Sequence, residues 1–124
     1  MWIFTREGFF SAVEVPAYDS PGHEGEVQVR ARNPEHLENL RKRYSLTEEV
    51  VSLGPHRDYG SRIYLDKEKW SNIVTDLVQS VDYDDFKTSV KNSGADSEYI
   101  DFLSDVWAVG YAYQEGHAGF PGSR

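Results

Sequence analysis

The chain has 124 residues, of which 39% are hydrophobic and 14% aromatic, and its formal net charge is −8. This length fits one domain with its own core, so we expect a single domain over residues 1–114 and a flexible tail over residues 115–124. The negative charge disfavours direct binding to nucleic acid. No cysteine is present, which excludes disulfides, thiolate metal sites and a cysteine nucleophile, and agrees with a reducing cytoplasm.

The N-terminal run shows no targeting or membrane signal. A membrane-spanning helix needs about 18 consecutive apolar residues or more, and no run in this chain approaches that length. Arg6, Glu7 and Glu14 interrupt the apolar residues of the first run, so we expect neither a signal peptide nor a membrane anchor. The predicted location is therefore the cytoplasm.

The first half of the chain alternates between strand signals and one helix signal. Residues 1–5 and 9–15 are β-prone runs separated by a connection that contains glycine, which predicts a hairpin. Residues 26–32 alternate apolar and polar side chains and predict a strand with one wet face. Asn33 and Pro34 then form a favourable helix start, and the helix is expected to reach Tyr44. Residues 48–53 predict a further strand.

The stretch from Ser61 to Val81 shows both structural periods. Ile63 and Leu65 alternate with polar neighbours, which predicts a strand over residues 61–65. Asp66 stands at the N-cap position of the helix that follows. Six apolar residues at helical spacing are expected to bury one stripe of that helix against the sheet: Trp70, Ile73, Val74, Leu77, Val78 and Val81.

Two more helices are predicted at the C-terminal end. The first starts at Asp82 as N-cap, with Asp85 in the style of a capping box, and stops before Gly94. The second runs from about Asp96 to Gln114 and has an apolar stripe so wide that it needs two neighbours. We expect this helix to pack on the domain, and a homodimer through its remaining face is kept as an alternative.

The order of elements predicts the architecture. Residues 26–81 have the strand-helix-strand-strand-helix order of a ferredoxin-like split β-α-β unit, and the N-terminal hairpin can supply the missing strand. We therefore expect an α+β fold. It is a two-layer sandwich, with a ferredoxin-like antiparallel sheet, helices on one face and two additional C-terminal helices.

If helices cover one face of the sheet, the other face carries the candidate binding residues. These are Arg30, Arg32, Asp58, Arg62 and Tyr64. One interpretation is structural: the arginines pair with acids, Asp58 with Arg62 among them, and lay their stems over apolar surface. The other is a site for an anionic or aromatic ligand, because guanidinium groups grip carboxylate or phosphate and stack on rings.

Catalytic and metal-binding patterns are poor. The four histidines are scattered over the predicted loops, a helix and the tail, and only His56 with Asp58 could form an acid–base pair. No phosphate-binding glycine loop and no calcium loop is present. We expect no catalytic residue, no metal and no cofactor, which favours a non-enzymatic function.

Several short motifs spread over most of the chain occur together: Met1–Thr5, Gly8–Ser11, Val29–Arg32, Asp58-Tyr59 with Arg62-Ile63, Lys69-Trp70, Asp82-Tyr83 with Phe86-Lys87, and Val106-Trp107. Together they resemble a family of small bacterial and bacteriophage proteins of unknown function, in which Asn is usual where this chain has Asp85. The resemblance leaves out the loop at residues 16–25 and the tail. It implies a self-contained domain, and it implies no activity and no catalytic residue.

The leading functional hypothesis is a small acidic module that binds a protein partner. Its binding surface is either the arginine-bearing sheet face or the acidic C-terminal helices, and one form of such a module is a phage-type inhibitor of a host factor. The alternative is a small-molecule or nucleotide-binding domain that uses Arg30, Arg32 and Arg62 to hold an anion.

Overall fold

A computed structural model describes residues 1–118 of the chain, and these residues form an α+β structure. The strands are β1 Trp2–Phe4, β2 Phe9–Glu14, β3 Val27–Ala31, β4 Val51–Ser52 and β5 Ser61–Leu65. The helices are α1 Pro34–Tyr44, α2 Lys67–Gln79, α3 Phe86–Asn92 and α4 Ser97–Ala118. The chain divides into two compact units, one over Met1–Asp82 and a second that begins at Tyr83.

The first unit is built on a five-stranded antiparallel sheet in the order β1-β2-β3-β5-β4. Strand β5 lies between β3 and β4 and is antiparallel to both. Strands β3 and β4 therefore run parallel to each other, with α1 in the connection between them.

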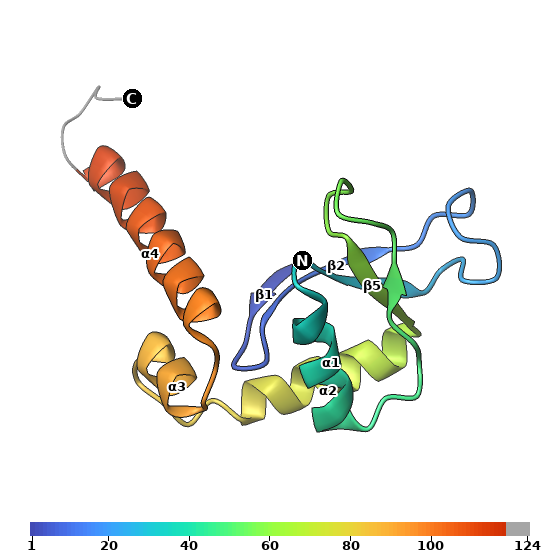
Figure 1. Cartoon of the computed structure of the whole chain (residues 1–124), viewed down its shortest axis with the longest axis horizontal. Helices are drawn as coiled ribbons and strands as arrows, with labels where there is room; N and C mark the ends of the chain where they lie inside the picture. The colour runs from blue at the N-terminus through green and yellow to red at the C-terminus, as the bar shows by residue number, and fades with distance from the viewer. Residues whose placement is uncertain (119–124) are drawn as a thin grey trace. The chain divides into compact units, whose positions relative to one another are not determined.

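One face of the sheet packs against α1 and α2, which overlap in the view of Figure 1. The side chains of Val29, Ile63 and Leu65 have no exposed surface, because alternate residues of β3 and β5 point toward the helices. The helices contribute Leu37, Leu40, Trp70, Ile73 and Leu77 to the same cluster. The core of the first unit therefore lies between the sheet and these two helices.

Side-chain caps begin all four helices, with Asp96 accepting the N–H of Tyr99 at the start of α4. Asn33 caps α1 by accepting the N–H of Glu35, and Asp66 caps α2 by accepting the N–H of Lys69. Both starts agree with the sequence prediction. The prediction of Asp82 as the N-cap of the next helix is wrong: Asp85 caps α3 and accepts the N–H of Thr88. The aspartate nearer the first apolar turn takes the role, since only its carboxylate reaches that turn.

Three predicted boundaries or faces differ from the structure. Strand β4 contains only Val51 and Ser52, not all of residues 48–53. Val78 and Val81 are exposed, because α2 ends at Gln79 and its buried stripe is limited to Trp70, Ile73 and Leu77. Val78 instead borders a shallow surface groove together with Met1, Trp70 and Val74.

The second unit contains α3 and α4. Val90 of α3 and Tyr99 and Leu103 of α4 are buried. The Lys87 ammonium lies 5.0 Å from the centre of the Trp107 ring, a cation–π contact between the two helices. Helix α4 continues to Ala118, so residues 115–118 of the predicted flexible tail are helical, and the rest of that tail lies outside the described residues.

Gly8 occupies the closest backbone approach in the first unit. It follows the two-residue turn of the β1–β2 hairpin, and a Cβ atom placed on it would lie 2.2 Å from Cγ of His36. The His36 ring is held there because its Nδ1 faces the backbone N–H of Phe9 at 3.3 Å. A side chain at Gly8 would therefore displace α1 from the hairpin.

We expect Gly8→Ala to lower the free energy of unfolding by about 2 kcal/mol or more, because the new methyl group overlaps a buried ring. Urea unfolding measures the change. Gly110→Ala is the matched control: nothing lies within 4 Å of its added Cβ, and it should leave α4 unchanged or stabilise it by up to about 1 kcal/mol. Equal stability of Gly8→Ala and the wild type would contradict this packing.

Candidate functional site

The sheet face opposite α1 and α2 carries one cross-strand row with a residue from each strand. Directly paired residues in an antiparallel sheet point to the same side. The row runs across the sheet as Trp2, Ser11, Arg30, Arg62 and Val51. The prediction that Arg30 and Arg62 share the face away from the core is confirmed by this register.

Tyr59 inserts its ring between two of the predicted arginines. The guanidinium carbon of Arg30 lies 4.5 Å from the ring centre and that of Arg32 lies 4.1 Å from it. Tyr59 is only 4% exposed, and its φ of 55° lies in the left-handed region that bulky residues rarely occupy. The β4–β5 loop therefore holds this ring in place at a conformational cost, which the two cation–π contacts help to offset.

Asp58 forms an ion pair with Arg32, and the predicted pairing of Asp58 with Arg62 is wrong. The Arg32 Nη1 to Asp58 Oδ1 distance is 2.7 Å, and both side chains are more than half exposed. This hydrogen bond raises the pKa of the Arg32 guanidinium. The positive φ of Tyr59 turns the loop so that its preceding carboxylate faces the end of β3 and not β5.

Arg30 and Arg62 use their guanidinium groups differently. Arg30 donates from Nη2 to the hydroxyl of Ser11 at 2.7 Å. Arg62 is 9% exposed and donates from Nη1 to the side-chain oxygen of Gln28. The Gln28 amide nitrogen in turn lies 3.5 Å from a carboxylate oxygen of Asp19. Both arginines are thus bonded to neutral groups.

Tyr64 belongs to a separate contact. The ring of His23 stacks on it at a centroid distance of 4.2 Å, and its hydroxyl lies 3.0 Å from that of Ser20. His23 Nδ1 also lies 2.5 Å from a carboxylate oxygen of Glu26. The contacts of Tyr64 with His23 and Ser20 therefore hold the β2–β3 loop against the sheet. Of the predicted site residues, the structure groups Arg30, Arg32 and Asp58 around Tyr59, which was not predicted as a site residue, and Arg62 is the cross-strand partner of Arg30.

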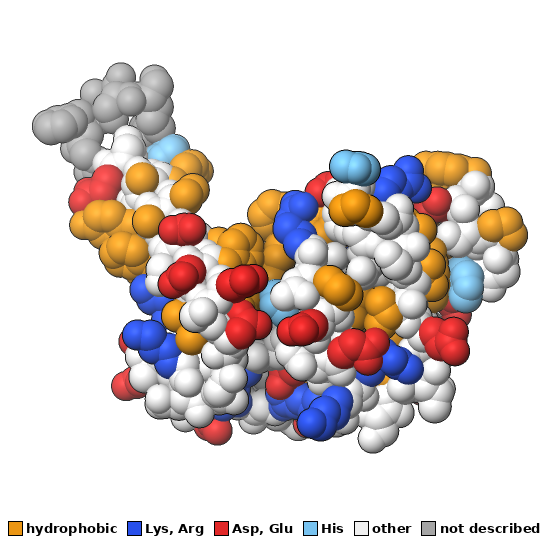
Figure 2. All heavy atoms as spheres, viewed as in Figure 1, with side chains coloured by type: hydrophobic (Ala, Val, Ile, Leu, Met, Phe, Trp, Pro, Cys, Tyr) orange, Lys and Arg blue, Asp and Glu red, His pale blue; other side chains and the backbone are white. Residues whose placement is uncertain are grey.

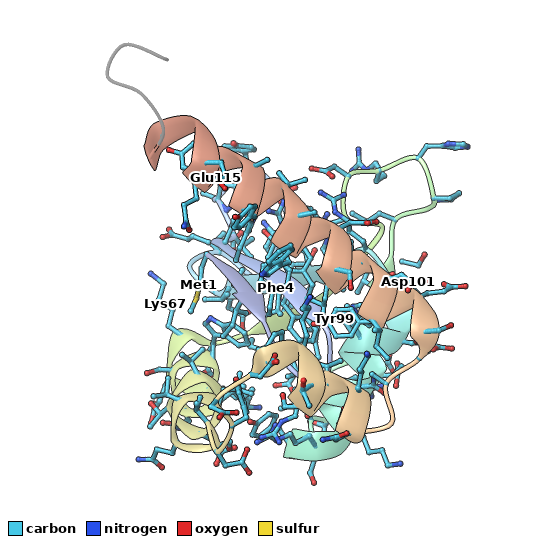
Figure 3. All side chains as sticks on the ribbon, turned by 90° about the vertical axis from the view of Figure 1, so that its left-hand side faces the viewer. Met1, Phe4, Lys67, Tyr99, Asp101 and Glu115 are labelled. Atoms are coloured by element: carbon cyan, nitrogen blue, oxygen red, sulfur yellow. The ribbon has the colours of Figure 1, made fainter. Side chains whose placement is uncertain are left out.

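A second candidate surface follows α4. Six large apolar side chains of this helix are exposed, and several of them are visible along it in Figure 2: Phe102, Val106, Trp107, Val109, Tyr111 and Tyr113. The charged side chains of the helix are acidic apart from His117, with Asp101 and Glu115 near its two ends in Figure 3. No Lys or Arg occurs between Ser97 and Ala118.

Three of the four histidines make local contacts in the described part of the chain. His36 and His23 make the structural contacts given above, and His117 Nδ1 lies 2.9 Å from the carbonyl oxygen of Tyr113 within α4. Among residues 1–118, no three His, Asp or Glu side chains gather in a way that could hold a metal ion. The same residues include no helix long and apolar enough to cross a membrane.

Comparison with known proteins adds no relative. No family model, no curated protein and no solved structure matches this chain. The resemblance to small bacterial and bacteriophage proteins therefore stays a prediction. Any function must be argued from the two surfaces themselves.

The Tyr59 hydroxyl provides a test of how the stacked ring is held. It is buried and has no hydrogen-bond partner among residues 1–118. We expect Tyr59→Phe to keep or raise the melting temperature, because the variant retains the ring and removes an unsatisfied donor. Tyr59→Leu should lower the free energy of unfolding by about 1 to 2 kcal/mol through loss of both cation–π contacts.

Thermal unfolding of the two variants beside the wild type is the measurement. A Tyr59→Phe variant that is as destabilised as Tyr59→Leu would show that the hydroxyl, and not the ring, makes the stabilising contact.

Proposed function

We propose that the chain is a cytoplasmic, non-enzymatic protein-interaction module and that α4 carries its binding surface. The observation behind this proposal is the exposure of large apolar side chains on one helix. Val109 and Tyr113 are 71% and 70% exposed, and Trp107 is 57% exposed. Large apolar side chains that remain exposed along one helix mark a candidate interaction site on a folded protein.

The residue types on α4 also fit an interface. Trp and Tyr are enriched among the residues that contribute most to binding free energy at protein interfaces. The Trp107 and Tyr111 rings stack on each other at a centroid distance of 5.2 Å and an interplanar angle of 12°. This stack fixes two large side chains before binding, so less side-chain entropy is lost when a partner covers them.

Charge indicates the chemistry of the partner. The described helix carries four carboxylates, from Glu98, Asp101, Asp105 and Glu115, with no Lys or Arg. A helix of this kind fits an apolar groove with a basic rim, in the helix-in-groove mode of recognition. A phage-type inhibitor of a host factor is one form that this module can take.

The same charge pattern bears on self-association. A second copy of α4 could supply apolar surface through exposed residues spaced three and four apart, such as Phe102, Val106, Val109 and Tyr113. It would also bring together two helices that each carry four carboxylates and no Lys or Arg, and like charges at an interface oppose association. We therefore favour a heterologous partner over a homodimer.

The proposal includes a finer fold assignment for the first unit. A ferredoxin-like two-layer arrangement is supported by the β3-α1-β4-β5-α2 order and by the position of β5 between β3 and β4. Strand β2 borders β3 on its other side. It would stand where the last strand of a ferredoxin-like sheet stands, although it precedes the unit in the chain.

The test is affinity capture from a bacterial lysate with three tagged baits. The wild type and a Tyr18→Ser control, which removes a 91% exposed tyrosine outside α4, should capture the same partner. A Trp107→Ser/Tyr111→Ser variant should lose at least tenfold of it, because two anchor side chains are removed.

Circular dichroism should show the same helix content in all three baits, and light scattering reports whether the free protein is monomeric. Equal capture by all three baits would rule out the Trp107–Tyr111 stack as the binding surface. A dimer that the double variant abolishes would replace the heterologous partner with a second copy of the chain.

A further inference from the structure

Arg30 and Arg62 form a pair of like charges on adjacent strands. They are direct partners in the β3–β5 register, so their side chains leave the sheet side by side on the same face. Like charges placed directly opposite each other destabilise a sheet. Arg62 is moreover nine-tenths buried, and arginine is rarely buried to this degree without a charged partner.

No carboxylate in the described part of the chain balances this pair. The ion pairs of residues 1–118 use other cations: Arg6, His23, Arg32, Arg41, Arg43, Lys67 and Lys69. The acid nearest to Arg62 by hydrogen bonding is Asp19, reached only through the Gln28 amide. In a chain with 21 acidic and 13 basic residues, an unbalanced arginine pair with one buried member is unexpected.

Three polar groups at this place lack hydrogen-bond partners. Arg30 Nε, Arg62 Nε and the Tyr59 hydroxyl are buried, and none of them is bonded within residues 1–118. Each unsatisfied buried donor costs about 1 to 3 kcal/mol. All three come from one sheet face and from the loop that covers it, since the Tyr59 ring lies on Arg30.

We propose that the arginine pair, Arg30 and Arg62, is a binding site for a small oxyanion, a phosphate or carboxylate group of a small molecule. Neighbouring strands lie about 5 Å apart, so two guanidinium groups on paired positions can hold one anion between them. Each guanidinium offers several N–H donors in a planar fork that matches carboxylate and phosphate oxygens. The Ser11 and Tyr59 hydroxyls supply further donors at the edge of the pair.

Access to the site runs past the β4–β5 loop. The Arg32–Asp58 ion pair is exposed, and exposed pairs of this kind stabilise a structure by about 0 to 1 kcal/mol. Displacing Tyr59 also relieves its left-handed backbone conformation. Opening the loop to admit a ligand also breaks the two cation–π contacts of Tyr59, which offsets part of the binding free energy.

The net charge of the protein favours a small anionic ligand over an extended polyanion. With a charge of −8, the protein repels an extended polyanion along most of its surface, whereas a small anion meets only the local field of the two arginines. The site is a feature of the first unit, so it goes beyond the protein-interaction role proposed for α4 and does not depend on it.

Thermal unfolding in sodium phosphate and in sodium succinate, at ionic strength held constant with sodium chloride, tests the site and separates the two sources of oxyanion. A ligand at ten times its Kd should raise the melting temperature of the wild type by several degrees. The Arg30→Gln and Arg62→Gln variants should lose this response. Arg57→Gln, which removes an exposed arginine of the β4–β5 loop, should keep the rise in melting temperature.

Arginine Nε–H resonances of the wild-type protein give a second measurement that needs no stable variant. Phosphate or succinate should shift the signals of Arg30 and Arg62, while the signal of Arg57 stays in place. The inference is overturned if neither anion stabilises the wild type or moves these two signals. It is equally overturned if both glutamine variants respond as the wild type does.

Discussion

The alternation of side chains along β3 and β5 is the constraint on which the rest of the first unit depends. Each strand buries every second residue beneath α1 and α2, and each fully buried aliphatic side chain contributes about 1.5 to 3 kcal/mol. A shift of one residue would turn Arg30 and Arg62 into that core. The hydrophobic effect on one face therefore keeps the two guanidinium groups adjacent on the other.

Local patterns predicted the elements well where a short stretch decides its own structure. Examples are the caps at Asn33 and Asp66 and the alternation in β3 and β5. The structure contains each of these elements within an α+β fold. The extent of burial depends on distant neighbours. Val78 continues the apolar stripe of α2, yet no element covers it within the described residues, and helical spacing alone carries no information about that.

The candidate site was predictable only where the alternation along a strand decides the position of a side chain. Strand alternation places Arg30 and Arg62 on one face, but it does not reveal that Asp58 pairs with Arg32 or that Tyr59 lies between two arginines. Those contacts depend on a left-handed backbone at Tyr59. Glycine is the residue that usually signals such a conformation, and a tyrosine gives no such signal in the sequence.

Both edge strands of the sheet are short. Strand β1 has three residues and β4 has two, so each border offers only a few backbone N–H and C=O groups to an incoming extended chain. Long unpaired borders are the usual template for intermolecular β-pairing and for fibril growth. This molecule presents little of that template, and any specific assembly it enters must be held by side chains and not by a shared sheet.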